Sequence, residues 1–237
     1  MGRGASKASA AGGGTNPAVE KTLNQIIKRT QNLKKEQYRI VNEDGEVVLT
    51  KQGEKDNVKM TVGEHRQYTE GATTIHNHPQ IDEGLGGPPS PSDIKDFGYG
   101  AREIVIASNE GTYRLKNTKY GTPQERDGWR PLQEALQKIA DDQSSVAIIR
   151  KSNDIMANSK TGKEMHKISE TWVKRKSEGA SQAELDKYMS KFDSLQKQYK
   201  TELGQLRRKM ELEPYHEFYK KNAKKYGFSY TYPKGAY

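Results

Sequence analysis

The sequence contains no cysteine among its 237 residues, and no run of apolar residues approaches the length of a membrane span. The first absence excludes disulfides and thiolate metal sites, so His, Asp and Glu are the side chains left to bind a metal ion. The second excludes a transmembrane helix, which needs about 18 consecutive apolar residues. The N-terminus is small and basic, but no apolar stretch follows it, and we therefore expect no secretory signal peptide.

Hydrophobic residues are also scarce. They make up 32% of the sequence, against 30% for charged residues. A chain of this length can bury a core, but this composition indicates a modest one with solvated helices around it.

Positive charge is concentrated in the C-terminal part of the chain. The net charge is +9, and residues 151–237 contain 19 Lys and Arg against 11 Asp and Glu, whereas residues 1–150 contain 21 and 20. Such an excess fits either a solvated helical face or a contact surface for nucleic acid or an acidic protein. The basic residues mostly alternate with acidic ones, which weakens the case for nucleic acid.

Three segments differ in composition and periodicity. Residues 1–16 are Gly, Ala and Ser with scattered cations, and they predict a disordered tail. Residues 17–150 mix helical and strand patterns, and residues 151–237 predict a basic helical extension. The predicted fold class is therefore α+β, with a mixed sheet flanked by helices and a helical C-terminal extension.

The region 17–150 contains clear start and turn signals. Asn16 followed by Pro17 is typical of the beginning of a helix, and Asp44-Gly45 is typical of a tight hairpin turn. The expected elements are a helix over 17–34, strands over 38–41, 46–50, 57–62, 72–78, 103–108 and 112–117, a short helix from about 92 to 97, a helix over 131–142, and a strand or helix start at 145–150.

The extension has helical periodicity. Residues 160–178 carry one apolar stripe, and the capping-box spacing that begins at Ser181 predicts a long helix to about residue 212. An antiparallel hairpin of these two helices is the simplest arrangement, and dimerisation through the same apolar seam is the alternative. Pro214 is expected to begin a last short helix that ends at Gly227, before an aromatic segment that forms a strand or a docked tail.

A candidate metal site begins with two histidines on one strand. His76 and His78 are two residues apart, so their side chains point to the same face, about 6.6–7 Å apart along the strand. Pro79 ends the strand at once, which places the pair at its rim. Asp93 follows a Gly- and Pro-rich loop and supplies a third ligand. Two imidazoles and one carboxylate leave a fourth position open, as in catalytic zinc sites.

The sequence of this region is similar to the motif of a known family. HNHP at 76–79 with SPSD at 90–93 resembles the JAMM (MPN or JAB) metallopeptidase motif, and most of all its RadC-like branch and the JAMM-type domains of phage and prophage proteins associated with head morphogenesis. The resemblance covers roughly residues 34–118. It implies a Zn²⁺ cofactor, a zinc-activated water, a glutamate general base and cleavage of peptide or isopeptide bonds. The loop from His78 to Ser90 is longer here than in the family.

Two further residues complete the predicted site. Ser90, three residues before Asp93, is the candidate donor to the oxyanion of a tetrahedral intermediate. Ser92 competes with it, and helix capping is the other role open to Ser92. In the family the glutamate precedes the first strand, and Glu36 holds that position here. The acidic residues set aside are Glu64 and Glu70, which lie too far along the strand, and Glu43 and Glu46, which flank the hairpin turn.

The sequence thus predicts a zinc hydrolase whose partner is a protein or peptide substrate. The alternatives are a non-enzymatic phage virion or assembly protein that binds a phage structural protein, and a DNA-associated RadC-like module. By the same resemblance we expect the protein in the cytoplasm of a bacterial host or on a virion, not in a membrane. Both a monomer and a dimer through the C-terminal helices fit the pattern.

Overall fold

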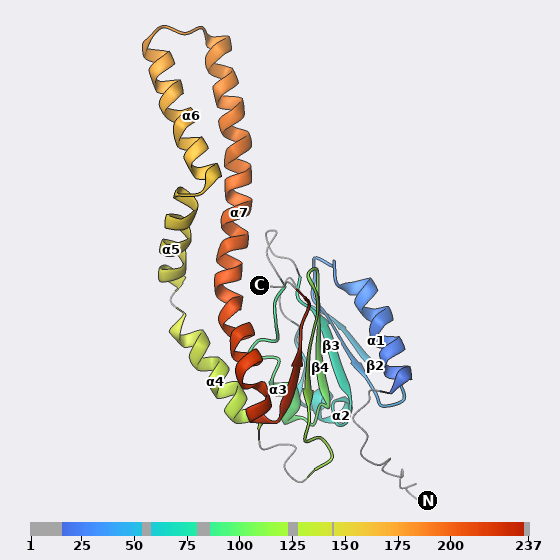
Figure 1. The fold of residues 1–237 in the computed structure, drawn as a ribbon. Coiled ribbons are helices and arrows are strands. Elements are labelled where there is room, and N and C mark those ends of the chain that lie inside the picture. Colours follow the sequence, from blue (N-terminus) through green and yellow to red (C-terminus); the bar gives the residue numbers. More distant parts are fainter. Residues whose placement is uncertain (1–15, 54–57, 80–85, 123–127, 144, 235–237) are drawn as a thin grey trace, which may run out of the picture.

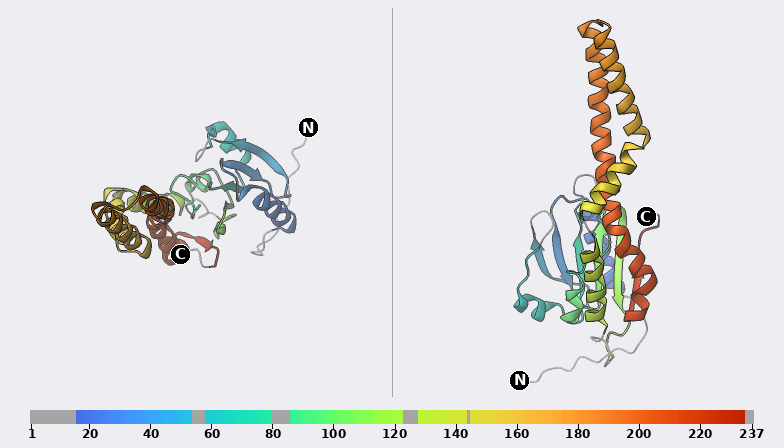
Figure 2. Two further views of the ribbon diagram at one scale, coloured as in Figure 1. Left: turned by 90° about the horizontal axis from the view of Figure 1, so that it is seen from above. Right: turned by 90° about the vertical axis from the view of Figure 1, so that its left-hand side faces the viewer.

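The computed structural model describes residues 16–53, 58–79, 86–122, 128–143 and 145–234. They form an α+β fold in which one sheet lies between helices and a long pair of helices extends beyond it (Figures 1 and 2). The elements are α1 (Pro17–Thr30), β1 (Gln37–Val41), β2 (Val47–Gln52), α2 (Val62–Tyr68), β3 (Thr73–Asn77), α3 (Lys95–Gly98), β4 (Glu103–Ser108), β5 (Gly111–Asn117), α4 (Trp129–Asp142), α5 (Ser145–Ala157), α6 (Lys160–Ser177), α7 (Gln182–Asn222), the 3-10 helix η1 (Ala223–Tyr226) and β6 (Phe228–Thr231).

The sheet has six strands in the order β2-β1-β3-β4-β5-β6. The pair β3–β4 is parallel and the other neighbours are antiparallel, so the predicted mixed sheet is confirmed. β3 and β4 lie at its centre, and every residue of both strands is buried. The end of β3, where the two histidines lie, is therefore built on the most deeply buried pair of strands.

One face of the sheet is covered by α1. The side chain of Asn16 accepts a hydrogen bond from the amide of Ala18, and Pro17 occupies the first turn, as predicted. The helix ends at Thr30 rather than at residue 34. The amide of Leu33 donates a hydrogen bond to the carbonyl of Thr30, and this turn redirects the chain toward β1. The apolar side chains of the helix, Val19, Leu23 and Ile26, pack on this face of the sheet. Their partners are Val41 on β1, Ile75 on β3 and Val105 on β4.

The largest core lies on the opposite face. It joins β4 and β5 to α3, α4 and the last part of the chain, where β6 pairs with β5. The aromatic segment near the C-terminus is therefore a strand and not a docked tail, with residues 235–237 outside the described ranges. The predicted division at residues 150 and 151 stays a prediction, although the sheet includes a strand from beyond it. The buried members of this core are Ile94, Phe97, Ala101, Ile104, Ile106, Tyr113, Leu115, Leu132, Leu136, Tyr219, Ala223 and Phe228.

The helices α5 and α6 and the first part of α7 form an arm that extends beyond the sheet (Figures 1 and 2), whereas the last part of α7 packs in the main core. α6 packs antiparallel against α7, which confirms the predicted hairpin. The side chains of Ser159 and Ser181 cap the N-termini of α6 and α7. Residues 145–150, which fit either a strand or a helix, belong to α5. No described helix is long and apolar enough to cross a membrane.

Two predicted elements are wrong. The strand expected over 57–62 is absent in its described part: residues 58–61 are irregular and α2 begins at Val62. The cause is a capping box, in which the side chain of Thr61 accepts from the amide of Glu64 and the Glu64 side chain accepts from the amide of Thr61. That Thr-x-x-Glu signal was present in the sequence beside the alternating pattern.

The last helix also differs from the prediction. α7 runs unbroken through Pro214 to Asn222, so Pro214 does not begin a new helix. A proline inside a helix removes one backbone hydrogen bond. Packing on both sides of it offsets that loss, because Leu212, His216 and Tyr219 are all buried.

Candidate metal centre

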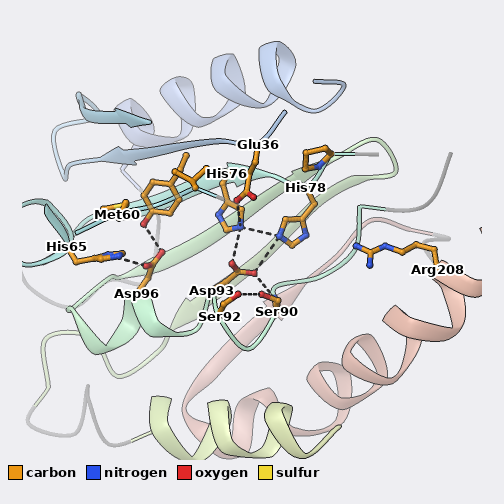
Figure 3. Close-up of a pocket in the computed structure, with 13 residues that line it drawn as sticks. Glu36, Met60, His65, His76, His78, Ser90, Ser92, Asp93, Asp96 and Arg208 are labelled. Atoms are coloured by element: carbon orange, nitrogen blue, oxygen red, sulfur yellow. Dashed lines mark hydrogen bonds and ion pairs between the residues drawn. The ribbon is translucent and has the colours of Figure 1, made fainter. Parts of the chain in front are cut away.

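Three predicted ligands come from two neighbouring segments. His76 lies on β3 with its side chain on the face opposite α1, since it pairs across the sheet with Tyr38 and Ile106. His78 lies one residue beyond the end of β3, and its amide still donates to the carbonyl of Ala107. Asp93 lies in the turn before α3 and faces both rings (Figure 3).

The distances among these side chains are short and similar. His76 Nε2 lies 3.2 Å from His78 Nε2 and 3.2 Å from Asp93 Oδ1, and His78 Nε2 lies 3.5 Å from Asp93 Oδ2. The three ligand atoms all lie within 4.8 Å of one another, and the group could bind a metal ion. Within the described ranges no other group of three His, Asp or Glu side chains is arranged in this way.

The His78 ring has a defined orientation. Its Nδ1 lies 3.0 Å from the carbonyl oxygen of Gly86. A carbonyl oxygen only accepts, so Nδ1 is the donor to Gly86 and Nε2 faces His76 and Asp93. The His76 ring is held differently: it stacks on Tyr38 with ring centroids 5.7 Å apart, and its Nδ1 is buried without a hydrogen-bond partner.

The charges around the group favour a cation. Burial would by itself lower the pKa of His76, but the carboxylates of Asp93 and Glu36 outweigh it and raise that pKa to about 9. Burial would likewise raise the pKa of Asp93, but His76 and His78 lower it well below its usual value. The negative charge of the buried carboxylates would be compensated by a proton on His76 or by a metal ion. A bound metal ion would take the place of that proton.

Glu36 lies beside the group. Its Oε1 is 3.9 Å from His76 Nε2, and the residue is 9% exposed. Asn77, between the two histidines, holds it there: Asn77 Oδ1 accepts from the amide of Gln37 at 2.8 Å, and Asn77 Nδ2 donates to the carbonyl of Lys35 at 3.1 Å. The side chain of Asn77 therefore fixes the backbone on both sides of Glu36.

The other acidic residues considered in the sequence lie elsewhere. Glu64 pairs with Lys51 on β2, and Glu46 accepts from Asn42 in the β1–β2 turn. Glu43 is in the same turn, at the opposite end of β1 from Glu36. Glu70 lies close to Gly100, before β3.

The two serines face each other beneath Asp93 (Figure 3). Their Oγ atoms are 2.6 Å apart, and the amide of Ser90 donates to Asp93 Oδ2 at 2.6 Å. The expected capping role of Ser92 is wrong, because α3 begins only at Lys95 and has no side-chain cap. Successive turns over 90–97 delay the helix, with the amide of Asp93 bonded to the carbonyl of Ser90.

A cavity of about 290 Å³ opens over the group. It extends past Tyr38 to Asp96, whose carboxylate accepts from the Tyr38 hydroxyl at 2.7 Å and lies 3.6 Å from His65 Nδ1. On the other side Arg208 reaches from α7 toward His78 (Figure 3). The sequence did not indicate Tyr38, Asp96 or Arg208 as neighbours of the motif, and it placed His65 in a polar turn outside the site.

No protein family, curated protein or solved structure matches this chain.

Proposed function

We propose that this protein is a zinc-dependent hydrolase of peptide or isopeptide bonds. The observation that carries the proposal is the convergence of His76, His78 and Asp93 at the end of β3, with the buried carboxylate of Glu36 beside them. The resemblance of the HNHP and SPSD segments to the JAMM motif supports the same reaction.

The donor set suits zinc better than other common ions. Two imidazoles and one carboxylate are ligands that zinc accepts, whereas calcium and magnesium prefer oxygen alone. With zinc–ligand bonds of about 2.0–2.1 Å, the corners of a tetrahedron are about 3.3–3.4 Å apart. The separations of 3.2, 3.2 and 3.5 Å are close to that value. Three protein ligands leave one coordination position open.

A bound zinc ion would polarise the scissile carbonyl and make water a nucleophile near neutral pH. Glu36 would take the proton from that water and pass it to the leaving amine. The hydroxyl of Ser90, beside Asp93, would donate to the oxyanion that forms on the carbonyl. Each of these groups faces the same cavity.

The cavity walls indicate where a substrate chain would lie. Val58 and Met60 form an apolar side. Arg208 is the only Lys or Arg among the described lining residues. A guanidinium pairs well with a carboxylate, so an acidic residue of the substrate would lie on the side of α7.

The exposed arm favours a second candidate function. α6 and the adjoining part of α7 extend beyond the sheet (Figure 2) and carry mixed charges that are mostly exposed. An assembly protein that uses this arm to bind a phage structural protein or DNA would also fit. A shift of DNA in native gels that weakens with salt would support the DNA case.

The first test is metal content. Elemental analysis would be made on protein purified without a histidine tag, beside the variants His76→Ala/His78→Ala and His166→Ala. His166 lies on α6 with its side chain 75% exposed, so it controls for adventitious histidine binding. We expect one zinc ion per chain in the wild type and in His166→Ala, and none in the double variant.

The second test is hydrolysis of peptide and ubiquitin-like isopeptide substrates by the zinc-loaded protein. A wild type without metal after incubation with zinc would overturn the proposal. Bound zinc that survives in His76→Ala/His78→Ala would overturn it as well, because the ion would then lie elsewhere.

A further inference from the structure

The loop that returns to the metal group is tightly seated where it is described. Residues 86–89 are buried. A Cβ added at Gly86 would lie 2.5 Å from the Cβ of Ser108 and 2.9 Å from the carbonyl oxygen of His78. Real side chains do not approach that closely, so the backbone here lies directly against the ends of β3 and β4. A segment that lies so close to a metal ligand can position it.

A carboxylate from a distant turn holds this segment. Glu110 follows the end of β4, and its Oε2 accepts from the amide of Gly86 at 3.1 Å while its Oε1 accepts from the amide of Gly87 at 2.7 Å. The hydroxyl of Tyr113 donates to Oε1 at 3.0 Å and orients the carboxylate. Hydrogen bonds from backbone amides to a carboxylate are among the stronger ones, so two of them fix both glycines.

The same glycine contacts a metal ligand. The carbonyl oxygen of Gly86 accepts from His78 Nδ1, which directs Nε2 at His76 and Asp93. We propose that Glu110 is a positioning residue of the metal site, which acts through the backbone of Gly86 to set the tautomer and direction of the His78 ring. The inference rests on the metal site of the proposed function, but not on the reaction.

This chain of contacts has a measurable consequence. Groups that hydrogen-bond to a metal-ligating histidine raise metal affinity by about 10–100-fold, because they fix the ring and increase its basicity. Without Glu110 the amides of Gly86 and Gly87 lose their acceptor, and the carbonyl of Gly86 keeps only its contacts with His78 and Arg208 to hold it in place. The metal would then be bound more weakly, and with a changed arrangement of ligands.

The experiment compares three variants with the wild type. Glu110→Ala removes both acceptors, and Glu110→Gln keeps one oxygen that accepts an amide. Glu103→Gln is the control, because Glu103 lies at the other end of β4, is buried, and pairs with Arg114 at 2.7 Å. Zinc affinity is measured by competition with a chromophoric chelator. The visible spectrum of the cobalt-substituted protein reports on the ligand geometry.

We expect zinc affinity to fall about 10–100-fold in Glu110→Ala and by less in Glu110→Gln. The cobalt spectrum of Glu110→Ala should change. Glu103→Gln should lose thermal stability while its folded form keeps both the affinity and the cobalt spectrum of the wild type. A variant that weakened the site only through loss of stability would lower the melting temperature without altering the spectrum of the folded protein.

The outcomes separate this inference from the proposed function. A wild type that binds no zinc overturns both. A folded Glu110→Ala that binds zinc as tightly as the wild type, with the same cobalt spectrum, overturns the positioning role alone. Should Glu110→Ala not fold, Glu110→Gln decides: a severalfold loss of affinity supports the role, and an unchanged affinity rejects it.

Discussion

The hydroxyl of Tyr219, on α7, donates a hydrogen bond of 3.0 Å to the carbonyl oxygen of Pro89, which lies 130 residues earlier in the chain and next to Ser90. About two helical turns before it, Leu212 packs against Gly87, where an added Cβ would lie 2.6 Å from its side chain. The C-terminal helix therefore supports the loop that carries Ser90 and leads to Asp93. Support for the metal group comes from two directions, α7 on one side and Glu110 on the other.

The contact between Tyr219 and Pro89 can be tested by removing one atom. Tyr219→Phe leaves the buried carbonyl of Pro89 without this donor, and we expect a loss of about 1–3 kcal/mol of the free energy of unfolding. Denaturant unfolding measures it. Tyr188→Phe is the control, because Tyr188 lies on the arm portion of α7 and is half-buried there. An equal effect of both changes would mean that the hydroxyl of Tyr219 contributes nothing specific.

A second prediction concerns the C-terminal part as a whole. A chain that ends at residue 150 lacks Tyr219 and Phe228, both 1% exposed in the main core. Loss of a buried aromatic side chain costs about 3–5 kcal/mol, and a domain is stable by only about 5–15 kcal/mol. We expect this truncated chain to show no cooperative thermal transition by circular dichroism.

A matched deletion separates the core from the arm. Residues 163–196 would be replaced by a short Gly-Ser linker, since Thr161 and Gln198 are already in contact across α6 and α7. We expect this chain to unfold cooperatively and to bind metal as the full chain does. A truncated chain that folds on its own would instead establish residues 17–150 as an independent domain.

Local signals in the sequence predicted most strands and the group of His76, His78 and Asp93 that could bind a metal ion. His76 and His78 are two residues apart on a strand, and a proline directly follows His78. This spacing places both side chains on the same face, independently of the rest of the chain. The neighbours of the site were not predictable in this way. Glu110 and Arg208 reach it only because β4 lies beside β3 and because α7 returns along the sheet, and neither pairing has a signature in a single sequence.

The wrong predictions have a common physical cause. Residues 57–62 alternate as a strand does, yet the capping box at Thr61 competes for the same backbone and begins a helix. At Pro214 a local helix breaker is overridden by the burial of Leu212 and His216. In both places one local pattern is outweighed by a second interaction, a capping box in the first case and burial in the second.

A third prediction concerns substrate charge. With peptides that differ by one Glu or Gln near the scissile bond, the wild type should prefer Glu, and Arg208→Ala should lose that preference. A hydrogen bond to a charged group contributes about 1.5–3 kcal/mol, so kcat/KM for the acidic peptide should fall about 10–100-fold. The effect should lie mainly in KM, because on this proposal Arg208 contacts the substrate away from the reacting atoms.

The control for this change is the neighbouring residue. Arg207 points away from the cavity and bonds to Ser152 and Asn153 on α5, at 3.1 and 2.8 Å. Arg207→Ala should leave the preference for the acidic peptide intact. If it removes that preference as Arg208→Ala does, the cause is the net charge of α7 and not a contact in the cavity.

The last prediction separates metal binding from the reaction. Glu36→Gln keeps the size of the side chain and removes the base, and Oε1 of Glu36 lies 3.9 Å from His76 Nε2, beyond the closer separations among the three ligands. We therefore expect zinc content to remain at one ion per chain while kcat falls by about 10²–10⁴-fold. Glu46→Gln, at the opposite end of β1, is the control and should change neither quantity. Full hydrolysis by Glu36→Gln would assign the base to another residue. Loss of zinc together with activity would instead make Glu36 part of the metal site, because a base that acts only on water and the leaving group is not needed to hold the ion.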